Sequence, residues 1–237
     1  MYLFVIVGLI ATTCAERVRH PMENPDMYQG DILLVDDDDR NALVGDTYKW
    51  PGGVIPYEIS LSLTNGVNQI EKAMNYLSIT TCIQFTQRTY LDRDYLFIFP
   101  GDGCYSHWGR TGKRQPLSLG VGCLDLGTII HELMHAIGFK HEQNRSDRDD
   151  YLTIFWNNIQ PGFEHNFDKL KPHENWLINE FDYHSIMIYS ETSFSKDGRL
   201  KTMVPKKKGI VLTDVFYRFP TASDIYRINT LYGCKGN

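Results

Sequence analysis

One eleven-residue stretch constrains this chain more than any other feature, because residues 131–141 read His-Glu-Leu-Met-His-Ala-Ile-Gly-Phe-Lys-His. Apolar residues around it recur at helical spacing and predict a helix over residues 126–137. Gly138 ends that helix, because glycine enters the left-handed conformation without steric cost. His131 and His135 are four residues apart and therefore share one face of the helix.

This spacing predicts a catalytic zinc site. The reversal at Gly138 lets His141 return as a third ligand beside His131 and His135. Three imidazoles with an open fourth position are typical of catalytic zinc, whereas structural zinc usually has four protein ligands. Glu132 contributes no ligand but can reach a water bound to the metal. A structural zinc protein is the alternative, and the open fourth position disfavours it.

The N-terminus predicts export. Residues 2–11 form an apolar run that is too short to span a bilayer, and small residues follow up to Ala15. We therefore expect a signal peptide over residues 1–15 and a secreted, extracellular product. The sequence holds no other long apolar stretch, so we expect no membrane attachment. The net charge of −5 argues against a nucleic-acid binder.

Cleavage of the signal peptide would leave an even number of cysteines, namely Cys82, Cys104, Cys123 and Cys234. In an oxidising compartment these cysteines predict disulfide bonds, and their spacing excludes a Cys-x-x-Cys zinc site. Four cysteines allow three pairings, and spacing alone does not choose among them.

Residues 16–40 are polar and end in four aspartates followed by Arg40. Such a segment buries little apolar surface by itself, so the aspartate run is either a solvated linker or part of an exposed processing site. In the second case a trypsin-like protease would cut between Arg40 and Asn41. The domains would then be a signal peptide (1–15), a propeptide (16–40) and a catalytic domain (41–237).

The rest of the pattern predicts an α+β fold. We expect a strand at Val54–Ile59, which Pro56 would confine to an edge or an end, and an amphipathic helix over residues 67–77 capped by Thr64. Further expected elements are strands at 83–86 and 95–99, a glycine-punctuated edge strand within 101–122, a second helical pattern over 156–170 and a short helix at 222–231. A cleft between two subdomains fits this order.

Several motifs resemble the astacin family of zinc metalloendopeptidases, a branch of the metzincins. The zinc signature continues into Glu142-Gln143, and residues 182–189 are similar to the family's Met-turn segment. Residues 41–46 and 50–57 resemble the start of its mature domain, and residues 28–31 resemble its propeptide switch. The resemblance covers nearly all of residues 27–234. It implies a twisted mixed sheet with the zinc helix in the N-terminal half and an irregular C-terminal half.

The resemblance also implies roles for single residues. His131, His135 and His141 would bind one zinc ion, and Glu132 would be the general base and later the proton donor. Tyr189 would be a distant fifth ligand that swings away to stabilise the oxyanion. Met187 would form an apolar floor under the zinc.

The same resemblance implies how the precursor would be controlled. Asp31 would occupy the open zinc position as the zymogen switch, and cleavage after Arg40 would free the ammonium group of Asn41 to approach Glu142. Cys82 would pair with Cys234, and Cys104 with Cys123. One departure is Ile188, which stands where the family commonly has histidine.

We therefore expect a secreted, monomeric endopeptidase that acts on protein or peptide substrates and is activated by a trypsin-like protease. A binding protein on a dead protease scaffold is the alternative, and the intact Glu132 and zinc histidines argue against it. Asn144-Arg145-Ser146 is an expected N-glycosylation sequon. Digestive, hatching and venom roles are all compatible with the sequence.

Overall fold

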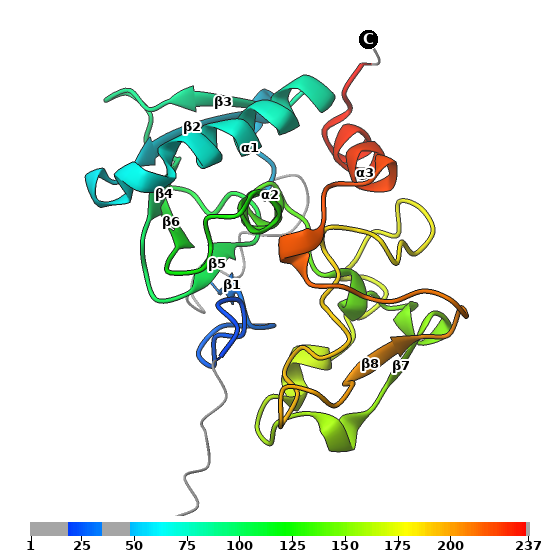
Figure 1. Cartoon of the computed structure of the whole chain (residues 1–237). Coiled ribbons are helices and arrows are strands. Elements are labelled where there is room, and N and C mark those ends of the chain that lie inside the picture. The colour runs from blue at the N-terminus through cyan, green and yellow to red at the C-terminus, as the bar shows by residue number, and fades with distance from the viewer. Residues whose placement is uncertain (1–18, 35–47, 236–237) are drawn as a thin grey trace, which may run out of the picture.

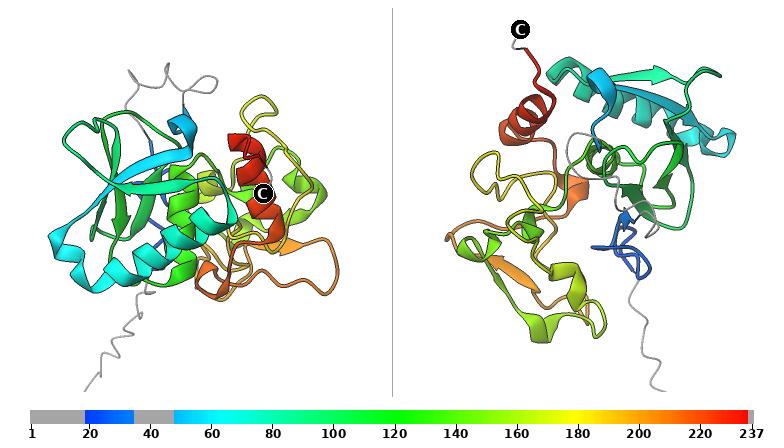
Figure 2. Two further views of the ribbon diagram at one scale, coloured as in Figure 1. Left: turned by 90° about the horizontal axis from the view of Figure 1, so that it is seen from above. Right: turned by 180° about the vertical axis from the view of Figure 1, so that it is seen from behind.

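The structure is a computed structural model, and it describes residues 19–34 and 48–235. A six-stranded sheet and two of the three α-helices lie in one half of the molecule, and a largely irregular chain forms the other half (Figure 1). Views from above and from behind separate the same two halves (Figure 2). The expected signal peptide, the aspartate run, Arg40 and Asn41 lie outside the described residues.

The large sheet has the strand order β1-β5-β6-β4-β2-β3. Its strands are β1 (Ile32–Leu33), β2 (Val54–Ile59), β3 (Gln84–Gln87), β4 (Tyr95–Phe99), β5 (Cys104–His107) and β6 (Arg114–Leu119). Only β5 and β6 pair antiparallel, so the sheet is mixed as expected.

Of the two positions expected for Pro56, an edge strand is wrong, because β2 lies between β3 and β4, whereas Pro56 does lie next to an end of the β2–β4 pairing. Pro56 pairs with Thr86 of β3, whereas the pairing of β2 with β4 begins one residue later, at Tyr57. A residue without an N–H is therefore placed where the ladder on one side has not yet begun.

Helices α1 (Val67–Thr80) and α2 (Leu126–Ala136) pack against each other and against the sheet. Ile70, Ala73, Met74 and Leu77 of α1 are buried, and α2 is buried from Gly127 to Ala136. Thr64 does not cap α1: it lies within a preceding 3-10 turn (Leu61–Gly66), and Gly66 takes the N-cap position.

Two other expectations need correction. The glycine-rich region 101–122 forms two strands, β5 and β6, instead of one edge strand, and β6 lies inside the sheet. The helical pattern over 156–170 forms only the 3-10 turns Trp156–Asn158 and Glu164–Phe167. Pro161 and Gly162 separate these turns, and Gly162 has a positive φ of 92°.

The C-terminal half contains a two-stranded sheet of β7 (Leu152–Ile154) and β8 (Met203–Pro205) and ends in α3 (Ala222–Tyr232). A disulfide bond between Cys82 and Cys234 ties the end of α3 to the first half, and a second bond joins Cys104 to Cys123. Among the described residues, none of the helices has the length and apolar character needed to cross a membrane.

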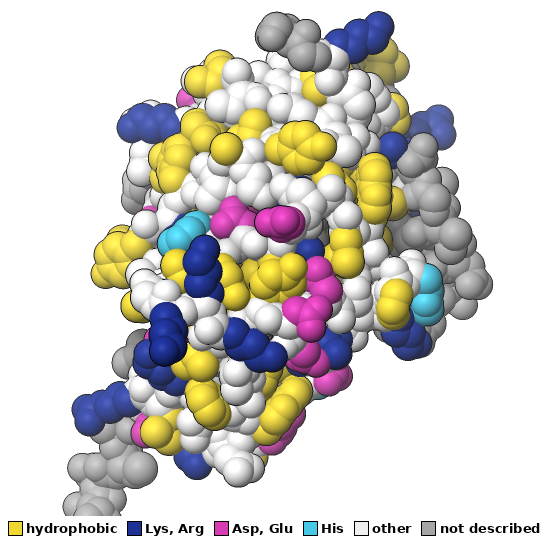
Figure 3. Space-filling model, turned by 90° about the vertical axis from the view of Figure 1, so that its right-hand side faces the viewer, with side chains coloured by type: hydrophobic (Ala, Val, Ile, Leu, Met, Phe, Trp, Pro, Cys, Tyr) yellow, Lys and Arg dark blue, Asp and Glu magenta, His cyan; other side chains and the backbone are white. Residues whose placement is uncertain are grey.

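Residues 19–34 lie between the two halves (Figure 1). On one side, β1 adds a parallel strand to β5, with Ile32 opposite Ser106. On the other side, the Glu23 carboxylate accepts a hydrogen bond from the Phe194 N–H at 2.9 Å. Basic side chains lie among acidic and hydrophobic ones on the face shown in Figure 3.

Candidate active site

Helix α2 positions two of the expected zinc ligands. Asp125 caps its N-terminus by accepting the Thr128 N–H at 2.8 Å, which fixes where the helix begins. His131 and His135 then lie on one buried face, with their Nε2 atoms 3.1 Å apart.

The hydrogen bonds of these two imidazoles define their tautomers. The Nδ1 of His131 lies 2.7 Å from the Ile186 carbonyl oxygen, and the Nδ1 of His135 lies 2.7 Å from the Phe139 carbonyl oxygen. A carbonyl oxygen only accepts, so each Nδ1 carries the hydrogen and each Nε2 presents a lone pair. Two such lone pairs at 3.1 Å repel each other unless a cation lies between them.

The turn after α2 supplies the third imidazole. Gly138 has a φ of 107°, as the sequence predicted for the residue that ends the helix, and its N–H donates to the His135 carbonyl. The chain reverses there and brings the Nε2 of His141 to 3.2 Å from those of both helical histidines. Two ligands at the usual zinc–nitrogen distance of a tetrahedral site are about 3.3 Å apart, so the three nitrogens fit one zinc ion.

A carboxylate from the N-terminal segment completes this group. The carboxylate oxygens of Asp31 lie 3.1–3.3 Å from the three Nε2 atoms, and all four side chains are buried. Paired backbone hydrogen bonds of 2.9 Å between Tyr28 and Ile32 close the tight turn that presents Asp31. At Gly30, where φ is 93°, a Cβ would lie 2.6 Å from the Phe194 ring, so the turn requires glycine.

The charge states fit a metal site. Burial lowers the pKa of His141 to about 4, so this imidazole is neutral at pH 7, as a ligand must be. Burial alone would raise the pKa of the Asp31 carboxyl, but its interactions with the three histidines hold that pKa well below its usual range. Three neutral nitrogens and one anionic oxygen are a donor set that zinc accepts. The described residues contain no other group of this kind.

Glu132 is the residue on α2 that has no structural partner. It is fully buried, and neither carboxylate oxygen has a hydrogen-bond partner among the described residues. Burial, and secondly the charge of Asp31, raise its pKa well above the usual range. An unpaired buried carboxyl group costs stability, so its presence here is more readily explained by chemistry than by folding.

Tyr189 reaches the same group from the other half of the molecule. Its hydroxyl donates to Asp31 Oδ2 at 2.7 Å, and the Gln29 carbonyl oxygen lies 2.9 Å from the same hydroxyl. Burial raises the pKa of Tyr189 well above 10, so the phenol stays protonated and remains a donor. The Tyr189 N–H donates to Oε1 of the buried Gln143, which fixes the backbone at this position.

The turn that precedes Tyr189 is held by its own hydrogen bonds. Met187 in this turn is buried. The fully buried carboxylate of Asp224 accepts the Ser185 hydroxyl at 2.6 Å and the Ile186 N–H at 3.0 Å. The Arg218 guanidinium donates to the carbonyl oxygens of Ser185 and Ile188. The departure at Ile188 thus leaves a buried apolar side chain on a turn that is tied through its backbone.

Glu142 lies in a buried charge network. Its carboxylate accepts two hydrogen bonds from Arg227, at 2.7 and 2.8 Å, and one from Arg145 at 3.0 Å. Its N–H donates to the Met187 carbonyl at 2.8 Å, which joins this network to the turn that precedes Tyr189. Any further cation that binds Glu142 would therefore join two guanidinium groups that already contact its carboxylate.

The sequon asparagine, Asn144, lies in the interior of the fold, which argues against its glycosylation. Asn144 is fully buried, and its amide nitrogen donates to the Asn166 and Asp168 carbonyls at 2.9 and 2.7 Å. A glycan on that nitrogen would remove one of these bonds and has no space. The side chain instead ties the chain after His141 to residues 166–168.

The sequence did not identify several residues that position the site. Gln29 orients His141, since its Oε1 lies 3.1 Å from His141 Nδ1, and Gln29 itself has a positive φ of 54°. It lies within the switch segment 28–31, but the resemblance assigns no role to its side chain. Asp224 could have been found as the third residue after Thr221 in a capping box, which the structure contains. Its second role, at Ser185, depends on a contact between residues 39 apart in the sequence.

Comparisons with known proteins agree with this geometry. The family model described as "Astacin", a peptidase family, matches residues 43–233. The chain is 45% identical over 215 residues to "Astacin-like metalloprotease toxin 1" from Loxosceles intermedia, covering 88% of this chain and 81% of that protein. It is 42% identical over 228 residues to "Zinc metalloproteinase nas-6" from Caenorhabditis elegans, covering 92% of this chain and 66% of the nematode protein.

Among solved structures, the chain is similar to "High choriolytic enzyme 1 (HCE-1), a hatching enzyme zinc-protease from Oryzias latipes (Medaka fish)". The TM-score is 0.73 with 37% sequence identity, and the match covers 86% of this chain and all of the fish structure.

Proposed function

The chain belongs to the astacin family of zinc metalloendopeptidases, and from this premise we propose that it is a secreted endopeptidase synthesised as an inactive precursor. We assign residues 1–15 to a signal peptide, 16–40 to a propeptide and 41–237 to the catalytic domain. Two disulfide bonds in the folded chain support export, because such bonds persist in oxidising compartments.

His131, His135 and His141 would hold the zinc ion in the active enzyme, with Asp31 as a fourth ligand in the precursor. Bound zinc supplies a Lewis acid that polarises the scissile carbonyl and makes water a better nucleophile. The carbonyl groups of Ile186 and Phe139 orient two of the imidazoles through Nδ1 and keep each Nε2 free to bind.

Glu132 would handle the protons of hydrolysis. Its two unpaired oxygens can take the proton of the attacking water and later give a proton to the leaving amine. In the closed precursor, burial raises the pKa of Glu132, and the charge of Asp31 raises it further. Departure of the segment admits water to this carboxyl and removes that charge, and both changes lower its pKa and favour the ionised form that acts as a base.

Tyr189 would stabilise the oxyanion. In the precursor its hydroxyl donates to Asp31 Oδ2, a negatively charged oxygen at the metal group. Once Asp31 leaves, the same hydroxyl can donate to a substrate oxygen on which negative charge develops. Tyr189 contacts Gln143 through its backbone N–H, so this contact does not occupy the hydroxyl.

Asp31 would silence the precursor because it fills the position that substrate and water need. Its carboxylate contacts all three histidines, and the Tyr28–Ile32 turn and β1 hold it there. Cleavage between Arg40 and Asn41 by a trypsin-like protease would separate this segment from the catalytic domain, which would then act as a monomer on protein or peptide substrates.

A cavity of about 630 Å³ offers a place for the new terminus. Its lining includes Glu142 and Arg227, and also Tyr48, the first described residue after the proposed cut. Asn41 and Tyr48 are seven positions apart, so the chain between them can extend about 23 Å. The ammonium group of Asn41 could therefore reach the Glu142 network, whose Oε2 accepts only from Arg227 among the described residues.

The test is digestion of casein by the trypsin-treated protein, with and without a zinc chelator. We expect digestion that the chelator abolishes and added zinc restores. Absence of digestion by the correctly processed, zinc-loaded protein would contradict the proposed activity.

A further inference from the structure

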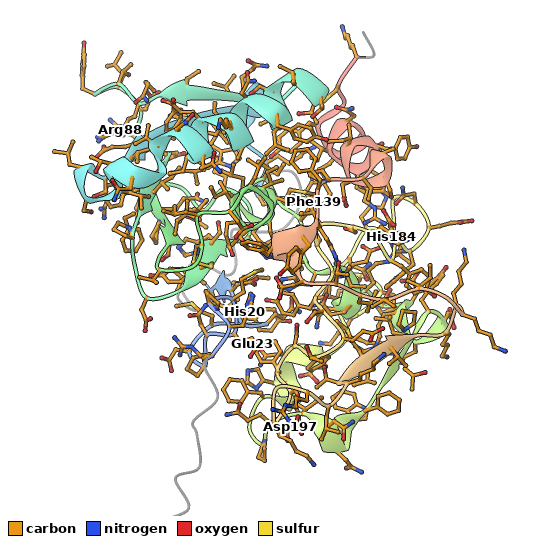
Figure 4. All side chains as sticks on the ribbon, in the orientation of Figure 1. His20, Glu23, Arg88, Phe139, His184 and Asp197 are labelled. Atoms are coloured by element: carbon orange, nitrogen blue, oxygen red, sulfur yellow. A yellow bond between two sulfur atoms is a disulfide. The ribbon has the colours of Figure 1, made fainter. Side chains whose placement is uncertain are left out.

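A small pocket beside Tyr189 is filled by the N-terminal segment. Only about 10 Å³ of it remains free. Figure 4 shows two of its lining residues, His20 and Glu23, between the two halves of the molecule. The segment contributes His20, Met22 and Glu23 to the lining, and the C-terminal half contributes Tyr189, Ser190, Ser193, Asp214 and Val215.

Met22 supplies the apolar occupant of this region. It is only 1% exposed and belongs to the main hydrophobic core, although it lies in the segment that activation would remove. Tyr189 and Val215, which are also buried, line the same pocket. Removal of the segment therefore opens apolar space next to the residue whose hydroxyl lies at the metal group.

Asp214 supplies a charge at the same pocket. Its Oδ2 lies 3.1 Å from His20 Nε2, while its Oδ1 accepts the Phe216 N–H at 3.0 Å and caps a 3-10 turn. Without His20, no partner for Oδ2 remains in the part of the chain that the structure describes. Arg218 acts on the negative charge of Asp214 only from a distance, because its guanidinium donates its hydrogen bonds to Thr213, Ser185 and Ile188.

We propose that this pocket is a substrate subsite that selects a lysine or arginine side chain, with Asp214 as the residue that sets the preference. The aliphatic stem of either side chain would take the place of Met22 against Tyr189 and Val215. Its cationic end would take the place of His20 at Asp214 Oδ2, as a charge-assisted hydrogen bond. An acidic side chain would be repelled by Asp214.

This inference rests on the proposed function, since it requires an active protease from which the segment has left. The experiment therefore begins with casein digestion by the trypsin-processed enzyme. A peptide library with sequenced products then identifies whether basic residues are enriched at one fixed position relative to the cut. Finally, kcat/KM is measured on two peptides that differ only by lysine or methionine at that position.

We expect the lysine peptide to be preferred by about 10-fold, the value of one charge-assisted hydrogen bond at a partly exposed site. Asp214→Asn should reduce that preference to about twofold or less, and Asp214→Glu should retain part of it. Asparagine also caps turns, so the fold should survive the change. Asp102→Asn is the matched control, because Asp102 pairs with Arg19 at an exposed site elsewhere.

Casein digestion without any preference for a basic side chain would overturn the subsite and leave the protease assignment standing. A preference that survives Asp214→Asn would also overturn it, because another residue would then be responsible. Failure to digest casein would contradict the proposed function, and the subsite with it.

Discussion

The two halves of the molecule are held together by different means. In the N-terminal half, α1 and α2 bury apolar stripes against a six-stranded sheet, so regular hydrogen bonds and hydrophobic packing carry the order. In the C-terminal half, long stretches of chain have no regular structure, and buried polar side chains link them. The chief examples are the buried Asn144, Glu142, Asp224 and Arg227 and the partly buried Arg218.

The two halves position different residues of the site. Regular structure places His131, His135 and Glu132 on one rigid helix. The irregular half brings Tyr189 and the Ile186 carbonyl to the same point through a turn fixed by side chains. Changes in the first half should therefore separate chemistry from stability, whereas changes in the second half should affect both together.

The largest expected effect is on the rate, from Glu132→Gln on α2. The change should lower kcat by roughly 10²–10⁴-fold, because the proton acceptor is lost. Zinc content and unfolding midpoint should stay near wild type, since Glu132 holds neither the metal nor a structural partner. Metal analysis and peptide hydrolysis on the same sample check this, and full activity would refute the role of Glu132.

The next effect is on stability, from Arg227→Ala in α3. It should destabilise the protein by about 3–5 kcal/mol, because Glu142 would keep only one of its two guanidinium partners in a buried site. Urea denaturation measures the loss, with Arg199→Ala at the exposed 197–200 turn as a near-neutral control. Adding Glu142→Gln to Arg227→Ala should recover part of the loss, and no recovery would mean that packing dominates.

A smaller effect is expected from Asn144→Ala. The Asn166 and Asp168 carbonyls would lose their partner, at a cost of about 1–3 kcal/mol. Asn157→Ala, at an exposed position in the same half, serves as the matched control. A mass decrease of wild-type secreted protein on glycosidase treatment, absent in Asn144→Ala, would contradict the buried amide.

The smallest effect is a pH dependence of stability that comes from His107, which lies beside β1. Burial beside β1 lowers the pKa of His107, whose Nδ1 has no partner among the described residues. The unfolded chain therefore takes up a proton first, so this contribution to precursor stability is complete above about pH 6.5 and is lost as the pH falls below it. Urea midpoints between pH 8 and 5 should fall less for His107→Gln than for wild type, and identical profiles would contradict this.

The regular half could be predicted from the sequence, because periodicity reports burial. Strands β2 and β4 and helices α2 and α3 lie where the patterns placed them. The position of Pro56 inside the sheet could not be predicted, since it depends on where the pairing with β4 begins. In the irregular half, the helix predicted over residues 156–170 does not form. Pro161 and Gly162 interrupt the pattern, and Asn144 binds the carbonyls of residues 166 and 168.

For the site, the motif identified the three histidines that the structure brings together, and the resemblance identified Asp31 beside them. Neither the motif nor the resemblance predicted that Gln29 orients His141. That contact depends on a backbone conformation that few residues other than glycine adopt. The ion pair between Glu142 and Arg227 could not be predicted either, because the two residues are 85 apart in the sequence.

The peptidase activity of the uncut precursor is the decisive quantity, because the proposed mechanism requires Asp31 to close the metal site until the chain is cut. Arg40→Gln keeps the precursor uncut at this bond, and Asp31→Ala is added to that background. We expect Arg40→Gln to be inactive even after trypsin, and the double variant to show chelator-sensitive activity without cleavage. Uncut wild-type protein that hydrolyses peptides at the processed rate would contradict this mechanism.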